Sequence, residues 1–190
     1  RIEDGLKHMV QAISACPTTI HEVLTNAEKI GAGTMSLQGA NTYTGATNVV
    51  AGVLAIGAGG STQTTSTITV SSGATLRFDR NDIWGNHQAT TSSPIVVNQG
   101  TLATSGNFNT IINPVLNGGT VTLNGGASAS FPALAIKGTL TAGGTAASTI
   151  NVGTGSFNFI NIGPSGTAGT LIVDVADATA STATDLTINS

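Results

Sequence analysis

The chain has 190 residues, of which 39% are hydrophobic, 4% aromatic and 8% charged, and its formal net charge is −3. Six basic residues are too few for a nucleic-acid-binding surface, and no apolar run reaches the roughly 18 residues that a membrane-spanning helix needs. Twenty-five glycines and few aromatic residues do not suit an ordinary globular core, but an elongated repeat protein can bury a narrow one. Cys16 is the only cysteine, which excludes an internal disulfide. We expect Cys16 to serve as a small apolar residue, with a disulfide to another chain as the alternative.

The first 30 residues differ from the rest in charge and in periodicity. They hold seven of the fifteen charged residues and two of the three histidines, His8 and His21, which we expect to be solvated. Apolar residues recur at helical spacing, first at Ile2, Leu6, Met9, Val10 and Ile13, and then at Ile20, Val23, Leu24 and Ala27. This pattern predicts two short amphipathic helices, over 2–14 and 20–29, the second opening with a capping box at 19–22. We expect the segment either to cap the following domain or to dock on another subunit.

From residue 32 onward apolar and polar residues alternate, and glycine interrupts them. A degenerate unit recurs, in which alternating apolar residues precede a polar pair, a glycine, one further residue and another apolar residue. Copies begin at Val49, Ile68, Ile95, Val115, Leu134, Ile150 and Ile162. A period near 20 residues predicts short parallel strands in about eight rungs, stacked about 4.8 Å apart, with glycine at the bends. A β-sandwich is the alternative fold. Asn98, Asn117, Asn124 and Asn151 lie at turns and would form stacked amide ladders if they are in register.

The stretch 31–57 carries the most specific pattern in the chain. It contains, in order, Gly31, Gly33, Thr34, Leu37, Gly39, Asn41, Thr42, Tyr43, Thr44, Gly45, Thr47, Val49, Gly52 and Leu54. These residues resemble the passenger-associated transport repeat of bacterial autotransporters, also called the autotransporter-associated β-strand repeat, with Met35 replacing one leucine. The resemblance implies a right-handed parallel β-helix in a secreted or surface-exposed protein, usually as part of a long stalk. We therefore expect an all-β fold, a right-handed β-solenoid over 31–190, preceded by a short α-helical segment over 1–30.

One polar segment, which ends at Gln88, interrupts the alternation and contains the only tryptophan. Its Asp79, Asp82, Trp84 and His87 form a candidate contact site for a sugar, a Ca²⁺ ion or a partner. The two aspartates would also suit the paired carboxylates of a glycosidase. The alternative is a structural loop in which Arg77 or Arg80 pairs with these acids. We expect the loop 79–88 to project from the coil and to tolerate replacement.

Reactive side chains are scarce elsewhere in the solenoid, which carries only eight charged residues after residue 32. No motif indicates a nucleophilic triad, a phosphate-binding loop or a metal cluster, so we expect no enzymatic activity, no cofactor and no metal. The expected function is that of a structural extracellular solenoid, a stalk or fibre-forming segment of a surface or secreted protein. A carbohydrate-binding or carbohydrate-active β-helix, in contact with surface glycans, is the alternative.

The segment 185–190 predicts a further strand, after which a new repeat would begin. A solenoid that ends there exposes unpaired backbone groups. We expect this end either to continue into a longer stalk or to stack head to tail on another copy, which would generate a filament. The apolar residues expected at that interface are Ile2, Leu6, Met9, Val10, Ile13, Ile20, Val23, Leu24, Leu186 and Ile188.

Overall fold

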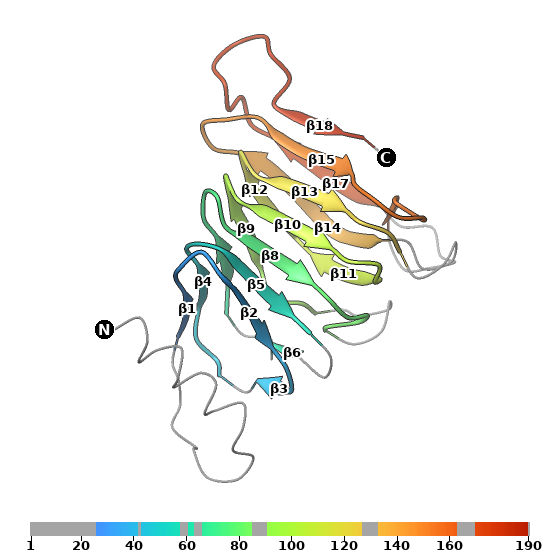
Figure 1. Cartoon of the computed structure of the whole chain (residues 1–190). Helices are drawn as coiled ribbons and strands as arrows, with labels where there is room; N and C mark the ends of the chain where they lie inside the picture. The colour runs from blue at the N-terminus through green and yellow to red at the C-terminus, as the bar shows by residue number, and fades with distance from the viewer. Residues whose placement is uncertain are drawn as a thin grey trace.

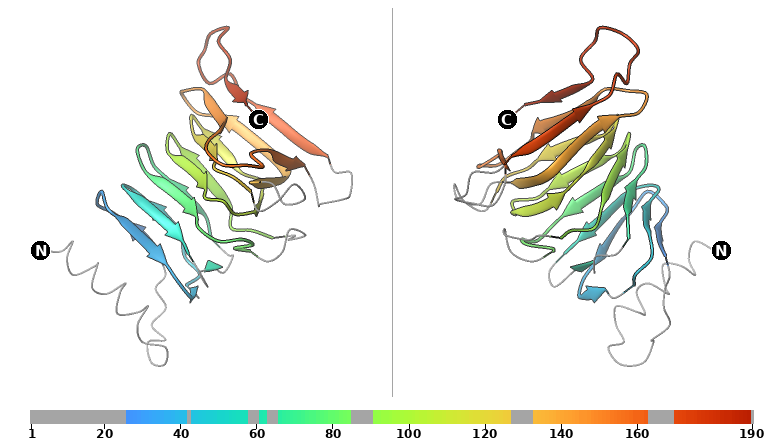
Figure 2. Two further views of the ribbon diagram at one scale, coloured as in Figure 1. Left: turned by 45° about the vertical axis from the view of Figure 1, so that its right-hand side comes forward. Right: turned by 180° about the vertical axis from the view of Figure 1, so that it is seen from behind.

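Short runs of β-branched residues and leucines, separated by glycine and asparagine, form parallel strands that stack into a coil (Figure 1). The computed structural model describes residues 26–41, 43–57, 61–62, 66–84, 91–126, 133–162 and 170–189. Eighteen strands lie in this described part. Each turn of the coil, or rung, contributes one strand to each of two long sheets, so that strands far apart in sequence lie at opposite ends of the stack (Figure 2).

Along the chain, a strand of one long sheet, sheet A, is followed each time by a strand of the other, sheet B. Sheet A contains β1 (Ala27–Lys29), β4 (Thr47–Val49), β7 (Ile68–Val70), β9 (Ile95–Asn98), β12 (Val115–Asn117), β14 (Leu134–Gly143) and β17 (Leu171–Val175). Sheet B contains β2 (Thr34–Leu37), β5 (Val53–Ile56), β8 (Thr75–Phe78), β10 (Thr101–Thr104), β13 (Thr120–Leu123), β15 (Ser148–Val152) and β18 (Leu186–Ile188). Seven described rungs therefore form the stack, one fewer than the predicted eight.

A third side closes part of the coil. Its strands are β3 (Ala40–Asn41), which pairs with β6 (Ser61–Thr62), and β11 (Asn109–Ile112) and β16 (Ile160–Ile162), which both pair with the first half of β14. The repeat unit did not assign strands to a third side, although two of its expected copies, those that begin at Leu134 and Ile162, start there.

Alternation within each strand turns every second side chain inward, and register stacks these side chains into columns. In sheet A one column runs through Val49, Val70, Val97, Leu116 and Ala142. In sheet B another runs through Leu54, Leu76, Leu102, Val121 and Ile150. All ten side chains are at most 1% exposed. The core is thus a continuous apolar filling that no single rung could enclose.

The corner between sheets A and B is tight, which explains the recurring glycine. Gly52 joins β4 to β5 with φ of +68°, and a Cβ atom there would lie 2.5 Å from the carbonyl oxygens of both Gly31 and Gly33. A side chain would therefore clash with the backbone of the preceding rung as well as strain its own. This confirms that glycine is needed at this bend.

Three expected copies of the repeat unit do not lie at the corner between sheets A and B. The copy that begins at Ile150 starts in β15 and leaves sheet B, and the copy that begins at Ile162 starts on β16 of the third side. The run that begins at Leu134 forms β14, in which Gly138, with φ of +77°, bends the strand from the third side into sheet A. In the preceding rung Asn113, with φ of 50°, stands at this bend, and its Oδ1 accepts a hydrogen bond from the Thr139 amide at 2.8 Å. Both corners require a left-handed residue followed by alternation, so the sequence pattern does not distinguish them.

The predicted helix over 20–29 is wrong at its end, and no helix is found among the described residues. Residues 27–29 form β1, whose backbone pairs in parallel with β4, because this pairing satisfies amides and carbonyls that a lone helical turn would leave to water. The predicted helix over 2–14, and the part of the second before residue 26, lie outside the described residues. Nothing in the described chain forms a helix long and apolar enough to cross a membrane.

The expected amide ladders form in part. Asn117 lies in register with Asn98 and donates from Nδ2 to its Oδ1 at 2.8 Å. Asn151 pairs with Asn189 of the next rung at 3.1 Å. Asn124 instead accepts a hydrogen bond from the Thr154 amide at 3.1 Å, so it supports a turn and not a ladder.

Candidate functional site

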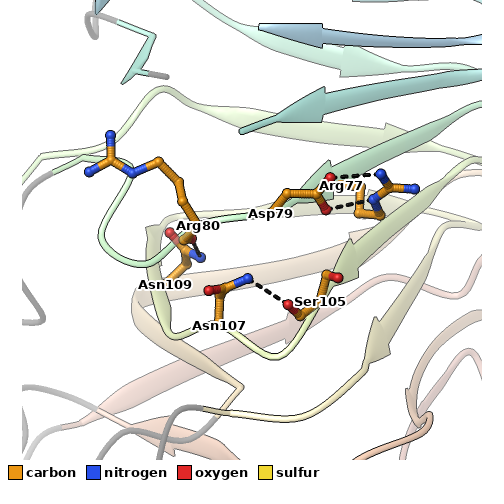
Figure 3. A network of polar contacts seen from close by, with 6 residues as sticks. All are labelled: Arg77, Asp79, Arg80, Ser105, Asn107 and Asn109. Carbon is orange, nitrogen blue, oxygen red and sulfur yellow. Dashed lines mark hydrogen bonds and ion pairs between the residues drawn. The ribbon is translucent and has the colours of Figure 1, made fainter. Parts of the chain in front are cut away.

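The candidate contact site follows β8. Its first carboxylate, that of Asp79, forms an ion pair with Arg77. Arg77 lies on the outer face of sheet B between Ala55 and Ala103 of the neighbouring rungs, whose small side chains leave room for its guanidinium. Its Nε and Nη2 each donate to one oxygen of Asp79 at 2.6 Å, as Figure 3 shows. This bond raises the pKa of Arg77. Both Asp79 oxygens therefore accept a hydrogen bond from Arg77, as predicted by the alternative of a structural loop in which Arg77 pairs with an acid.

A buried asparagine fastens the next residues to the following rung. Asn109 is fully buried and stands in a column with Leu134, where an apolar side chain would be expected. Its Nδ2 donates to the Arg80 carbonyl at 2.8 Å, and its Oδ1 accepts from the Ile83 amide at 3.0 Å. These bonds join two backbone groups of the irregular segment 79–84 to the following rung. Asn109 and Arg80 lie beside each other in Figure 3.

Two further bonds complete this attachment. The Asp82 amide donates to the Phe108 carbonyl at 3.0 Å, and the Phe108 amide donates to Asn81 Oδ1 at 2.7 Å. Asn107, also drawn in Figure 3, donates only locally, to the Ser105 carbonyl. The segment 80–83 therefore follows the next rung closely, in place of a regular strand on the third side.

Trp84 packs inward and does not form an exposed platform. Ile83 is 3% exposed, and Trp84 packs against the core with its ring 5.5 Å from that of Phe78, at an angle of 85°. Trp84 Nε1 is buried and has no hydrogen-bond partner among the described residues. The expectation that the whole loop 79–88 projects is therefore wrong for Ile83 and Trp84, because their apolar surface is more stable against the core than in water.

The structure brings only part of the predicted contact set together. Asp79, Asp82 and Trp84 lie on one short segment, but the first is held by Arg77 and the third is packed on the core. His87 lies outside the described residues. No cluster of three or more histidine, cysteine, aspartate or glutamate residues that could hold a metal occurs in the part that the structure describes.

Only two of the ten predicted assembly residues lie in the described part of the chain. Leu186 packs partly on the core from β18, and Ile188 of the same strand is 45% exposed. The other eight, from Ile2 to Leu24, lie outside the described residues. The strand expected after Asp185 is confirmed as β18.

Sequence reasoning missed Asn109, although a signal existed. Asn109 and Ile111 have the same parity in one strand, so both must point inward if Ile111 does. An inward asparagine requires buried partners, which here are the backbone groups of the segment that precedes it by one rung.

Comparison with known families agrees with the resemblance found in the sequence. The profile of the passenger-associated-transport-repeat family matches residues 28–56. These residues comprise β2 to β5 and the corner at Gly52, that is, the first complete turn of the coil. Searches among curated proteins and among solved structures find no match.

Proposed function

We propose that this chain is a structural stalk segment of a secreted or surface-exposed protein, in which stacked rungs serve as a spacer. One observation carries the proposal: the inward columns continue without interruption from the rung that matches the passenger repeat up to Ile150. A passenger repeat is a part of surface-exposed or secreted proteins, and an uninterrupted core gives a rod whose length grows with the number of rungs. We further propose that the coil is right-handed, as parallel crossover connections almost always are.

The same proposal includes the absence of catalysis. The Asp79 carboxylate is paired with Arg77 through both of its oxygens, which gives no support to a role as a catalytic acid or base. The absence of an aromatic platform at Trp84 also gives no support to sugar binding at this segment. A structural role needs neither feature.

Surface labelling tests the location. An antibody raised against the folded chain should stain intact cells of the source organism as strongly as permeabilised cells, and added protease should remove the signal. Staining that appears only after permeabilisation would contradict the proposal.

A second experiment tests the absence of activity and sugar binding. The purified chain is incubated with a panel of bacterial and plant polysaccharides, and reducing ends and unsaturated products are measured, followed by binding to an array of glycans. We expect neither product nor binding. Binding that Trp84→Ala abolishes while Arg77→Ala does not would favour a carbohydrate-binding module instead.

A further inference from the structure

The outer face of sheet B carries a column of threonines. Alternation turns Leu54, Leu76 and Leu102 inward, so the residue before each of them points outward. Register stacks these outward residues over one another, and Figure 1 shows their strands side by side across one face of the coil. Threonine occupies six of the seven positions in this column, which runs through Thr34, Val53, Thr75, Thr101, Thr120, Thr149 and Thr187.

Sheet A provides an internal comparison. Its outward column contains two threonines among seven residues, namely Glu28, Asn48, Thr69, Val96, Val115, Thr141 and Asp174. Residues branched at Cβ are favoured in strands generally, and sheet A satisfies this preference with valine as well as with threonine. Strand propensity alone therefore does not explain why the face of sheet B repeats a single residue.

A second outward column lies beside the first on the same strands. It runs through Ser36, Ala55, Arg77, Ala103, Thr122 and Asn151. Arg77 is the only charged residue in these two columns, and it is paired with Asp79. From β10 to β15 both columns are therefore uncharged, and their side chains are short and mostly threonine.

The side chains of this part of the face are held in place. Threonine is branched at Cβ, which restricts its χ1 angle. The hydroxyl groups of Thr120 and Thr149 share a hydrogen bond of 3.3 Å across neighbouring strands, and Asn151 Nδ2 donates to Thr149 Oγ1 at 3.4 Å. Binding to this face would order few further side chains, which lowers its entropic cost.

The sheet sets the spacing of these groups. Neighbouring strands lie about 4.8 Å apart, and alternate residues of one strand, such as Thr120 and Thr122, lie about 6.6 Å apart. The face is thus a nearly rectangular array of hydroxyl and methyl groups. The first distance is close to the repeat of water oxygens along the a axis of hexagonal ice, and the second is somewhat shorter than the repeat along its c axis.

A lattice accounts for this face better than a single molecule does. Sites for small molecules are usually concave and combine a few different polar groups with apolar and aromatic side chains. Here one residue type repeats, and neither column contains an aromatic residue. A ligand that repeats at the strand spacing can contact every threonine in the same way, so many weak contacts add up to stable binding.

We propose that the outer face of sheet B from β10 to β15 binds the surface of ice, through Thr101, Thr120, Thr122 and Thr149. The methyl groups fill hollows in the outermost water layer, while the hydroxyl groups donate to and accept from its water molecules. The lack of charge matters here, because ions are not accommodated in the lattice of ice. This binding goes beyond the stalk function and does not depend on where the chain is displayed.

Ice growth in the presence of the purified full chain tests the proposal. We expect the chain to slow the recrystallisation of ice and to give growing ice crystals flat facets. Thr120→Tyr places a large side chain at the centre of the face, between Thr101 and Thr149, and should abolish both effects. Thr69→Tyr makes the same change in the outward column of sheet A and should leave both effects as in the parent chain.

A milder pair of variants separates loss of contact from loss of folding. Thr101→Ser combined with Thr149→Ser keeps the hydroxyl groups but removes two methyl groups from the face, and should weaken the inhibition of recrystallisation. Thr69→Ser combined with Thr141→Ser is the matched control on sheet A and should not. Circular dichroism melts verify that each compared variant is folded.

The proposal is overturned if the parent chain leaves the growth of ice unchanged, or if the sheet A and sheet B variants act alike. It is also overturned if the parent chain sediments with crystalline chitin or cellulose, loses this binding in Thr120→Tyr and has no effect on ice, because the face would then recognise an ordered polysaccharide. None of these results affects the surface-labelling experiment, so failure of this proposal and failure of the stalk function are distinguishable.

Discussion

The central rungs and the last rung contain the same kinds of residue in the same positions, but only the central ones bury them. Leu102 in β10 is fully buried, whereas Ile188, three strands further in the same sheet B column, is 45% exposed. Both residues are large aliphatic residues, and they occupy the same position within a rung. Burial is therefore a property of the stack, because each rung is covered by its neighbour.

The largest effect should come from shortening a central core residue. Leu102→Ala removes a fully buried side chain and leaves a cavity between two rungs, which should cost about 2–5 kcal/mol of unfolding free energy. Ile188→Ala, in the same column, should cost about 1 kcal/mol or less. Urea unfolding followed by circular dichroism measures both. Equal losses would mean that the last rung is covered in solution.

A second comparison concerns the corner glycines. A Cβ atom at Gly100 would lie 2.5 Å from the Ser71 carbonyl oxygen, whereas at Gly143 its nearest neighbour would be the Ala176 Cβ at 3.7 Å. Gly100→Ala should therefore destabilise the chain by about 1–3 kcal/mol, because the preceding rung must move. Gly143→Ala should change stability by about 0.5 kcal/mol or less. Thermal melts of the two variants decide, and a tolerant Gly100 would show that central rungs can separate.

The inward asparagine gives a third comparison, between a buried and a local hydrogen bond. Asn109→Leu keeps the volume approximately but leaves the Arg80 carbonyl and the Ile83 amide without their partner, at a cost of about 1–3 kcal/mol. Asn107→Ala removes only a bond to Ser105 and should be close to neutral. Stability and the tryptophan emission of Trp84 report the result. An unchanged emission spectrum in Asn109→Leu would contradict the attachment of the segment 79–84.

The smallest effect concerns pH and the first rungs. Tyr43 is half-buried and shares a hydrogen bond of 2.9 Å with Thr47, and burial raises its pKa above 10.0. The unfolded chain therefore loses this proton first as the pH rises. The contribution is fully present below pH 10.0 and is lost as the pH rises toward the folded-state pKa.

Comparing Tyr43→Phe with the parent chain isolates this term, since the chain contains one tyrosine. The variant should show a weaker decrease of stability above pH 10.0, while other basic groups titrate equally in both proteins. Parallel curves over the whole alkaline range would place Tyr43 in contact with water.

The sequence predicted the corner between sheets A and B well, because that corner combines strict alternation with a glycine that no other residue can replace. Val49, Gly52 and Leu54 show this together, and the adjoining strands β4 and β5 lie where the pattern puts them. The third side was missed, because its corner with sheet A gives the same pattern where glycine is present, as in the run from Leu134, and no glycine signal after β11, where Asn113 stands at the bend. Its irregular segment 79–84 depends on Asn109, about one rung away, and a local pattern does not contain such a partner.

The end of the predicted second helix failed for a similar reason. Helical spacing of apolar residues continued to Ala27, but residues 27–29 have a strand partner in β4. Local propensity and pairing therefore disagreed over three residues, and pairing prevailed, as tertiary contacts commonly do over weak helix signals. Lys29, which the predicted helix included, lies instead on β1 in register with the buried Val49 and is itself buried.

Register also determines how the chain folds. Each strand of sheet B pairs with the strand one rung later, and the separation of paired residues ranges from 19 (Thr34 and Val53) to 38 (Thr149 and Thr187). Closure entropy grows slowly with loop length, so these steps differ by only about 0.6 kcal/mol. We expect folding to begin between neighbouring rungs and to propagate rung by rung, as in growth of a one-dimensional lattice. Loss of order should begin at the exposed last rung and move inward. A lesion at Leu102 would instead divide the lattice, leaving two shorter stacks that melt separately.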